Sequence, residues 1–149
     1  MSDGKWAESQ VQLTLKTLET EFEGFDWQRL YDTHSAKSIL PAQVGDFLFF
    51  ATGVHGVIEV KETENPTKIA RANFGDQQLA LLRKRHKAGG AVWAVVYHTT
   101  VGVWRVIPYE VLGVQLSKSS TVDLSKHGTQ FDNVLEAIIY VLSESLEDL

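Results

Sequence analysis

The sequence predicts an α/β domain with a central mixed sheet flanked by helices. Apolar residues recur every three or four positions near both ends of the chain, a spacing typical of amphipathic helices. Between these segments, short apolar runs typical of strands surround one further helical segment. The 149 residues fit one domain, 1–149, because that length can bury most of its apolar surface around a single core.

A helix and a hairpin are predicted in the first half of the chain. The apolar spacing over residues 6–22 predicts a helix that ends at Gly24. Residues 46–52 and 56–62 are predicted as strands, and the letters TGVHG between them are typical of a hairpin connection. These two strands should therefore pair antiparallel.

A helix and two strands follow. Asp76 begins the helix and a Gly-Gly pair ends it. Residues 91–98 are almost continuously apolar, as a strand covered on both faces should be, and another strand precedes Pro108. We expect 91–98 to lie beside 56–62 in the sheet, joined through the crossover helix.

Composition excludes several classes of protein. No cysteine is present, so disulfides and thiolate metal sites are excluded, and no apolar run is long enough to cross a bilayer. The first residues lack the apolar segment of a secretory signal. No G-x-x-x-x-G-K-[ST] occurs, and the five histidines lack metal-ligand spacing. We expect a cytoplasmic protein, in the host cytoplasm if a phage encodes it.

Positive charge gathers in one window. The chain carries a net charge of −5, but residues 67–90 alone carry +5. Local cations determine affinity for phosphate, so this window is a candidate DNA-binding surface; the alternative is a solvated helix face. Its basic residues are Lys68, Arg71, Arg83, Lys84, Arg85 and Lys87.

Two opposite charges lie within the strand predicted at 56–62. Glu59 and Lys61 are two residues apart and share one face, where burial is costly unless the charges are paired or used. Asp46 opens the neighbouring strand, so both carboxylates, with the Val60 carbonyl, could bind Mg²⁺. Lys61 would then act on a water or a phosphate. The alternative is an ordinary Glu/Lys pair on an edge strand.

A longer pattern surrounds these residues. After the D-(x)n-E-x-K core come KET.N, then Asn73 five residues before Gln78, then a Gly-Gly pair eleven residues beyond Gln78. In these features residues 45–99 resemble the RecU-type Holliday-junction resolvases, a branch of the PD-(D/E)xK nuclease superfamily. GKWAES near the N-terminus more weakly resembles the GK..E helix of that family. Pro41 lies five residues before Asp46, where the family has an adjacent proline, and the long family insertion is missing before Glu59.

The resemblance implies a restriction-endonuclease-like core and a set of site residues. Asp46 and Glu59 would bind Mg²⁺, with Mn²⁺ as a substitute, and Lys61 would position the nucleophilic water. Gln78 would orient the lysine or a phosphate oxygen. Glu8 would complete the metal shell; its alternative is an exposed acid in a first helical turn.

The same resemblance implies a structure-specific endonuclease that resolves four-way junctions in branched double-stranded DNA by paired hydrolysis, acting as a homodimer. Two alternatives remain open: a PD-(D/E)xK nuclease for duplex or flap DNA, and a non-catalytic nucleic-acid-binding module of the same fold.

Two further segments are candidates for contacts. The tail 131–146 is predicted helical, and its apolar residues span about 160°, wider than one core contact requires. It would meet a second subunit or, alternatively, lie between the sheet and another helix. Residues 29–38, with Arg29 and Lys37, would grip the DNA backbone or form a plain surface loop.

Overall fold

The structure, a computed structural model, describes residues 4–30 and 45–147. A six-stranded sheet runs through its centre in the order β1-β2-β3-β5-β6-β8, and a separate two-stranded sheet pairs β4 with β7. The strands are β1 (Phe25–Arg29), β2 (Phe47–Ala51), β3 (Val54–Thr63), β4 (Lys68–Ala70), β5 (Ala91–His98), β6 (Val103–Pro108), β7 (Thr121–Asp123) and β8 (Thr129–Phe131). The helices are α1 (Lys5–Glu21), η1 (Arg71–Asn73), α2 (Asp76–Lys87), α3 (Tyr109–Lys118), α4 (Leu124–His127) and α5 (Val134–Glu147).

The predicted hairpin is confirmed. Strands β2 and β3 pair antiparallel, with Phe47 opposite Ile58. Thr52 and Gly53 form the turn with φ values of 46° and 87°. Positive φ at both central positions is the type I′ geometry, whose twist matches that of the strands it joins.

The predicted crossover is also confirmed. Strand β5 lies parallel to β3, with Ala94 opposite Glu59, and α2 lies between them in the chain. A helical crossover is how two parallel neighbours are joined. This connection places α2 above β3, where it can reach the charged residues of that strand.

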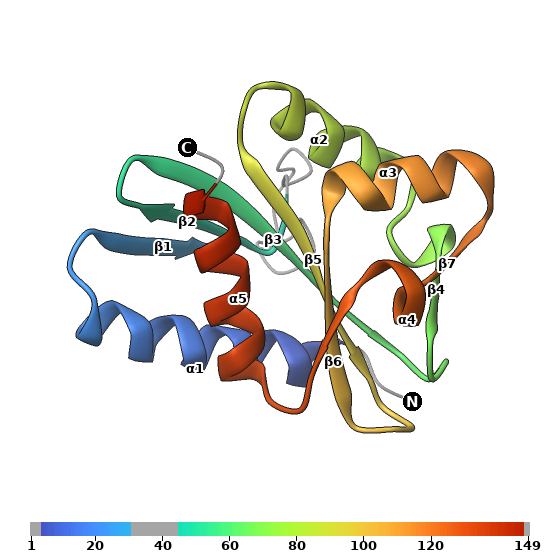
Figure 1. Cartoon of the computed structure of the whole chain (residues 1–149), viewed down its shortest axis with the longest axis horizontal. Helices are drawn as coiled ribbons and strands as arrows, with labels where there is room; N and C mark the ends of the chain where they lie inside the picture. The colour runs from blue at the N-terminus through green and yellow to red at the C-terminus, as the bar shows by residue number, and fades with distance from the viewer. Residues whose placement is uncertain (1–3, 31–44, 148–149) are drawn as a thin grey trace, which may run out of the picture.

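Helices cover the sheet on both faces, α1 and α5 on the lower face and α2 and α3 on the upper face in Figure 1. Ile58 and Val60 of β3 pack in the core under α1 and α5, whereas Val57 packs in the core under α2 and α3. Because side chains alternate along a strand, Glu59 and Lys61 project from the α2 face with Val57.

The seven-element order predicted from the sequence is incomplete. Strands β4, β7 and β8 have three residues each, too short to show a period of two, and β1 is a five-residue edge strand. Helix α3 directly follows Pro108, where we expected only the end of a strand. Phe131 ends β8 and so lies outside the C-terminal helix, contrary to the prediction. Within residues 4–30 and 45–147, no helix is long and apolar enough to cross a membrane.

Candidate active site

The β2–β3 hairpin brings the first two predicted ligands together. Asp46 lies one residue before β2, and its amide N–H donates to the Ile58 carbonyl over 3.1 Å. Its Oδ2 atom accepts a hydrogen bond of 2.6 Å from the amide N–H of Val60. Since the N–H and C=O of a strand residue point to the same side, the Val60 carbonyl faces the edge where Asp46 lies.

Glu59 is held at both oxygens. Its side chain is nearly buried, at 4% exposure. Nζ of Lys61 lies 3.1 Å from Oε1, and Nε2 of Gln78 donates to Oε2 over 2.7 Å. Gln78 therefore binds the carboxylate, where the resemblance implied the lysine or a phosphate oxygen. Nζ of Lys61 also lies 5.7 Å from the centre of the Phe74 ring.

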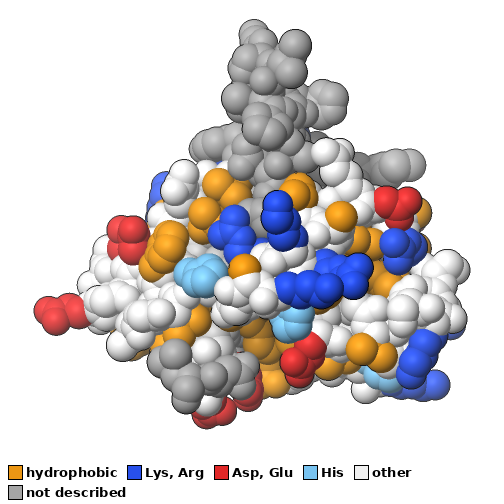
Figure 2. Space-filling view, turned by 90° about the horizontal axis from the view of Figure 1, so that it is seen from above, with side chains coloured by type: hydrophobic (Ala, Val, Ile, Leu, Met, Phe, Trp, Pro, Cys, Tyr) orange, Lys and Arg blue, Asp and Glu red, His pale blue; other side chains and the backbone are white. Residues whose placement is uncertain are grey.

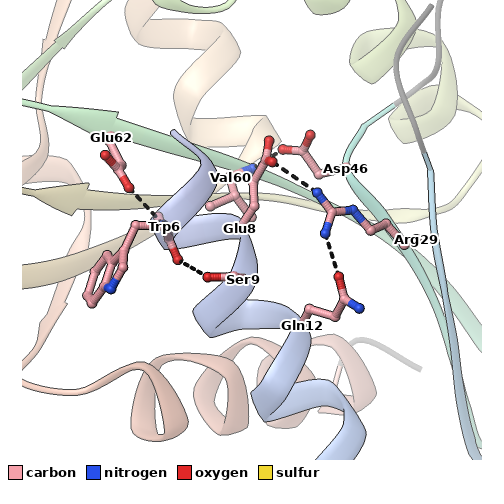
Figure 3. A network of polar contacts seen from close by, with 9 residues as sticks. Trp6, Glu8, Ser9, Gln12, Arg29, Asp46, Val60 and Glu62 are labelled. Carbon is pink, nitrogen blue, oxygen red and sulfur yellow. Dashed lines mark hydrogen bonds and ion pairs between the residues drawn. The ribbon is translucent and has the colours of Figure 1, made fainter. Parts of the chain in front are cut away.

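Helix α1 contributes Glu8 from the other side of the sheet. Glu8 interacts with Asp46, and its Oε2 atom lies 3.2 Å from Nη2 of Arg29 (Figure 3). Arg29 also donates to Oε1 of Gln12. The exposed-acid alternative for Glu8 is thus wrong, because its side chain is part of the cluster.

Sequence reasoning did not place Arg29 in this site. We expected it in a DNA-gripping loop at 29–38, but it ends β1 and its guanidinium binds Glu8. No spacing relates Arg29 to the D-(x)n-E-x-K pattern, so only the pairing of β1 with β2 could have indicated it. Most of the expected loop, from residue 31 on, lies outside the described residues.

Burial raises the pKa values of the three carboxyl groups, and neighbouring carboxylates add to this effect at Glu8 and Asp46. Burial, then the negative charge of Asp46, raises the pKa of Glu8 to about 7. Burial, then the charge of Glu59, raises the pKa of Asp46 to about 7. Burial raises the pKa of Glu59 as well, against the lowering effect of Lys61. Near neutral pH the cluster therefore favours a bound proton or a bound cation.

The donor set fits a hard divalent cation. Asp46, Glu59 and the Val60 carbonyl are oxygen donors at one place, and Mg²⁺ binds through one or two carboxylates while keeping several waters. Among the described residues, no three His, Asp or Glu side chains form a ready metal cage. An ion here would need water or substrate oxygens to complete its coordination.

The KET.N motif begins in the last residues of β3, and its Asn65 lies in the turn that follows the strand. Oδ1 of Asn65 accepts hydrogen bonds from the amides of Thr67 and Lys68. The ring of His98 contacts the Asn65 carbonyl at Nδ1 over 2.7 Å, and Arg105 donates to the Pro66 carbonyl over 2.7 Å. Side chains from β5 and β6 therefore hold this turn in place.

Most of the basic residues predicted to bind DNA lie on or near α2, but one lies in the two-stranded sheet. Arg71 and Arg83 both lie close enough to Tyr109 to affect its pKa, and Lys84 and Lys87 are exposed on α2. Figure 2, which looks onto the side of α2 and α3, shows Lys and Arg side chains gathered near the middle of that face. Lys68 instead lies opposite Asp123 in the small sheet. The remaining residue of the window, Arg85, is half-buried.

Together, the sheet and its helices define a restriction-endonuclease-like α/β fold, as predicted. The structure is similar to that of Hjc, a Holliday junction resolvase from the archaeal hyperthermophile Archaeoglobus fulgidus, with a TM-score of 0.59. The two sequences are 16% identical, and the match covers 90% of this chain and 98% of the other. At that identity the likeness establishes the fold alone. No model of a protein family matches the sequence, and no curated protein matches it.

Proposed function

We propose that the chain is a metal-dependent endonuclease that hydrolyses phosphodiester bonds in branched DNA, most specifically at four-way junctions. The observation that carries this proposal is the meeting of Asp46 and Lys61 around the buried carboxylate of Glu59. That cluster lies on a fold shared with a Holliday junction resolvase. The RecU-type pattern over residues 45–99 supports the same substrate class independently.

Each residue of the cluster has a role in this proposal. Asp46 and Glu59, with the Val60 carbonyl, would hold Mg²⁺, or Mn²⁺ as a substitute. The ion would supply positive charge beside the scissile phosphate. Lys61 positions the attacking water and stabilises negative charge on the phosphate. Gln78 keeps the Glu59 carboxylate in a fixed orientation, because it donates to one of its oxygens.

DNA binding is assigned to the basic window. The exposed residues Arg83, Lys84 and Lys87 lie on the helix that also carries Gln78. One helix can therefore hold the phosphate backbone and support the catalytic carboxylate. A homodimer with two such sites would match the approximate two-fold symmetry of a four-way junction.

Cleavage of matched DNA substrates tests the proposal. A four-way junction, a flap and a linear duplex of common sequence are incubated with Mg²⁺ or with EDTA. We expect cutting of the junction with Mg²⁺ only, and a chain that cuts the duplex or the flap equally well is instead a nuclease of the same fold for other DNA. Binding without any cutting would support the non-catalytic module.

Asp46→Asn identifies the site. The variant should lose cleavage, because hydrolysis needs the cation, yet keep junction binding, because binding depends on Lys and Arg contacts to phosphate. Asp26→Asn is the matched control, since Asp26 is exposed on β1 and should change neither property. Cleavage by Asp46→Asn at near the wild-type rate would show that the site is assigned wrongly.

A further inference from the structure

The first turn of α1 is anchored by a residue from the sheet. Oε1 of Glu62, in β3, accepts a hydrogen bond of 2.7 Å from the amide N–H of Ala7 (Figure 3). The first N–H groups of a helix have no acceptor within the helix, and a side chain at the N-cap normally supplies one. Here the N-cap is Gly4, which has no side chain. Glu62 supplies the acceptor from a distant part of the chain.

The anchored turn lies tightly against the sheet. Ala7 is fully buried in the core under α1 and α5. The ring of Trp6 lies 4.8 Å from that of Tyr97, the residue paired with Glu62 in β5. The contact of Glu62 and this ring packing therefore fix the same turn at neighbouring points of β3 and β5.

The next residue of that turn belongs to the candidate active site. Glu8 follows Ala7 directly, and its carboxylate reaches Asp46 and Arg29. Glu59 and Glu62 are three residues apart in β3, so they project from opposite faces of the sheet. Strand β3 thus presents a ligand on one face and anchors the helix that carries Glu8 on the other.

We infer that Glu62 is a positioning residue that holds the first turn of α1 so that Glu8 lies beside Asp46. This inference rests on the proposed function, and it adds Glu8 to the carboxylates that would hold the cation. Its physical basis is the fixed distance from a strand atom to a helix amide, which holds the backbone of the turn, while the contact with Arg29 holds the Glu8 carboxylate at its end.

Amide hydrogen exchange tests the anchor without any need for activity. The Ala7 amide of the wild type should exchange slowly, and Glu62→Ala should speed its exchange by about tenfold or more, because the only acceptor supplied by β3 is lost. Glu62→Gln keeps an acceptor oxygen and should restore much of the protection. Glu64→Ala removes an equal charge two residues away on an exposed side chain and should leave Ala7 unchanged. If the Ala7 amide exchanges as slowly in Glu62→Ala as in the wild type, the inference is overturned.

A double-mutant cycle tests whether the anchor acts through Glu8. Glu62→Ala should lower the junction cleavage rate and weaken Mn²⁺ binding, measured by calorimetry, by about 10-fold to 100-fold, the usual loss when a supporting residue is removed. In a Glu8→Gln background the same change should cost almost nothing further. Full additivity would show that Glu62 supports the fold generally and would overturn the positioning role.

The two proposals fail in different ways. A wild-type chain that neither cuts DNA nor binds Mn²⁺ overturns the proposed function, and with it the part of this inference that concerns Glu8. A chain that is active but whose Glu62→Ala variant cuts and binds Mn²⁺ like the wild type overturns this inference alone.

Discussion

Nε2 of Gln78 lies 2.7 Å from Oε2 of Glu59, so a hydrogen bond links α2 to the buried carboxylate of β3. The other oxygen of Glu59 is bound by Lys61 at 3.1 Å. With both oxygens held, the carboxylate has one orientation, and that orientation depends on the crossover helix as well as on the strand.

Gln78→Ala should therefore lower the cleavage rate by about 10-fold to 100-fold, because Glu59 loses the donor that orients it. Gln78→Glu should cost more, since a second carboxylate would repel Glu59. Gln77→Ala is the matched control: Gln77 is the exposed neighbour on the same helix. Single-turnover rates measure all three variants, and equal losses for Gln77→Ala and Gln78→Ala would remove Gln78 from the site.

Asp46→Asn should stabilise the cation-free protein at alkaline pH. Because folding raises the pKa of Asp46 to about 7, its contribution to stability is present below the unfolded pKa, near 4, and is lost as the pH rises through 7. Asparagine does not titrate. Chemical unfolding in EDTA should therefore show the variant about 1–2 kcal/mol more stable at pH 8, with a smaller difference at pH 4. A difference that does not change with pH would contradict the raised pKa.

Replacing Arg83, Lys84 and Arg85 with glutamine should weaken DNA binding and flatten its salt dependence. Each phosphate contact that is lost should reduce the slope of log K against log salt by up to about 0.9. The three side chains cannot all face one surface, because consecutive helix positions diverge by about 100°. Lys16→Gln, on the exposed side of α1, is a control for loss of charge alone. An unchanged slope in the triple variant would identify a merely solvated face.

His98 should make the fold less stable in acid. Burial, against the raising effect of its bond to Asn65, lowers the pKa of His98 below its usual value of 6.5. A histidine with a lowered folded-state pKa contributes stability above pH 6.5 that is lost as the pH falls toward the folded pKa. The stability advantage of the wild type over His98→Gln should therefore shrink between pH 7 and pH 5 in urea unfolding. An advantage that grows as the pH falls would show that folding raises the pKa of His98 instead of lowering it.

The working unit should be a homodimer that makes two symmetric nicks. Helix α5 buries Ala137, Ile138 and Val141 against the sheet and α1, while Leu135 and Ile139 remain 43% exposed. Light scattering should report about twice the 16.7 kDa chain mass. A cruciform-bearing plasmid should be linearised directly. A monomer that yields only open circles would exclude paired resolution and leave a simpler nuclease.

Sequence patterns predicted those parts of the fold that depend on residues close together in the chain. The hairpin, the parallel pairing of β3 with β5 and the shared face of Glu59 and Lys61 all follow from spacing and turn chemistry within residues 47–98. The three-residue strands β4, β7 and β8 follow from tertiary pairing and leave no period to detect.

The supporting residues of the site were harder to predict for the same reason. Gln78 could be found because the family spacing includes it. Arg29 and Glu62 support Glu8 through contacts that join β1 and β3 to α1, across 21 and 55 positions of sequence. Glu62 belongs to the KET.N motif, but the motif implied no contact with a helix 55 positions away, and nothing near Arg29 in the sequence distinguishes it from a solvated arginine.

The hairpin around the turn at Thr52 and Gly53 determines where the chain can change in length. Strand residues alternate between faces, so inserting or deleting one residue within either arm of the hairpin, 46–51 or 54–59, would send one of the two carboxylates to the opposite side of the sheet. Substitutions leave this parity intact, and so do insertions that lengthen only the turn. Length variation among functional descendants of this gene should therefore be confined to the turn itself, while the arms of the hairpin keep a constant number of residues.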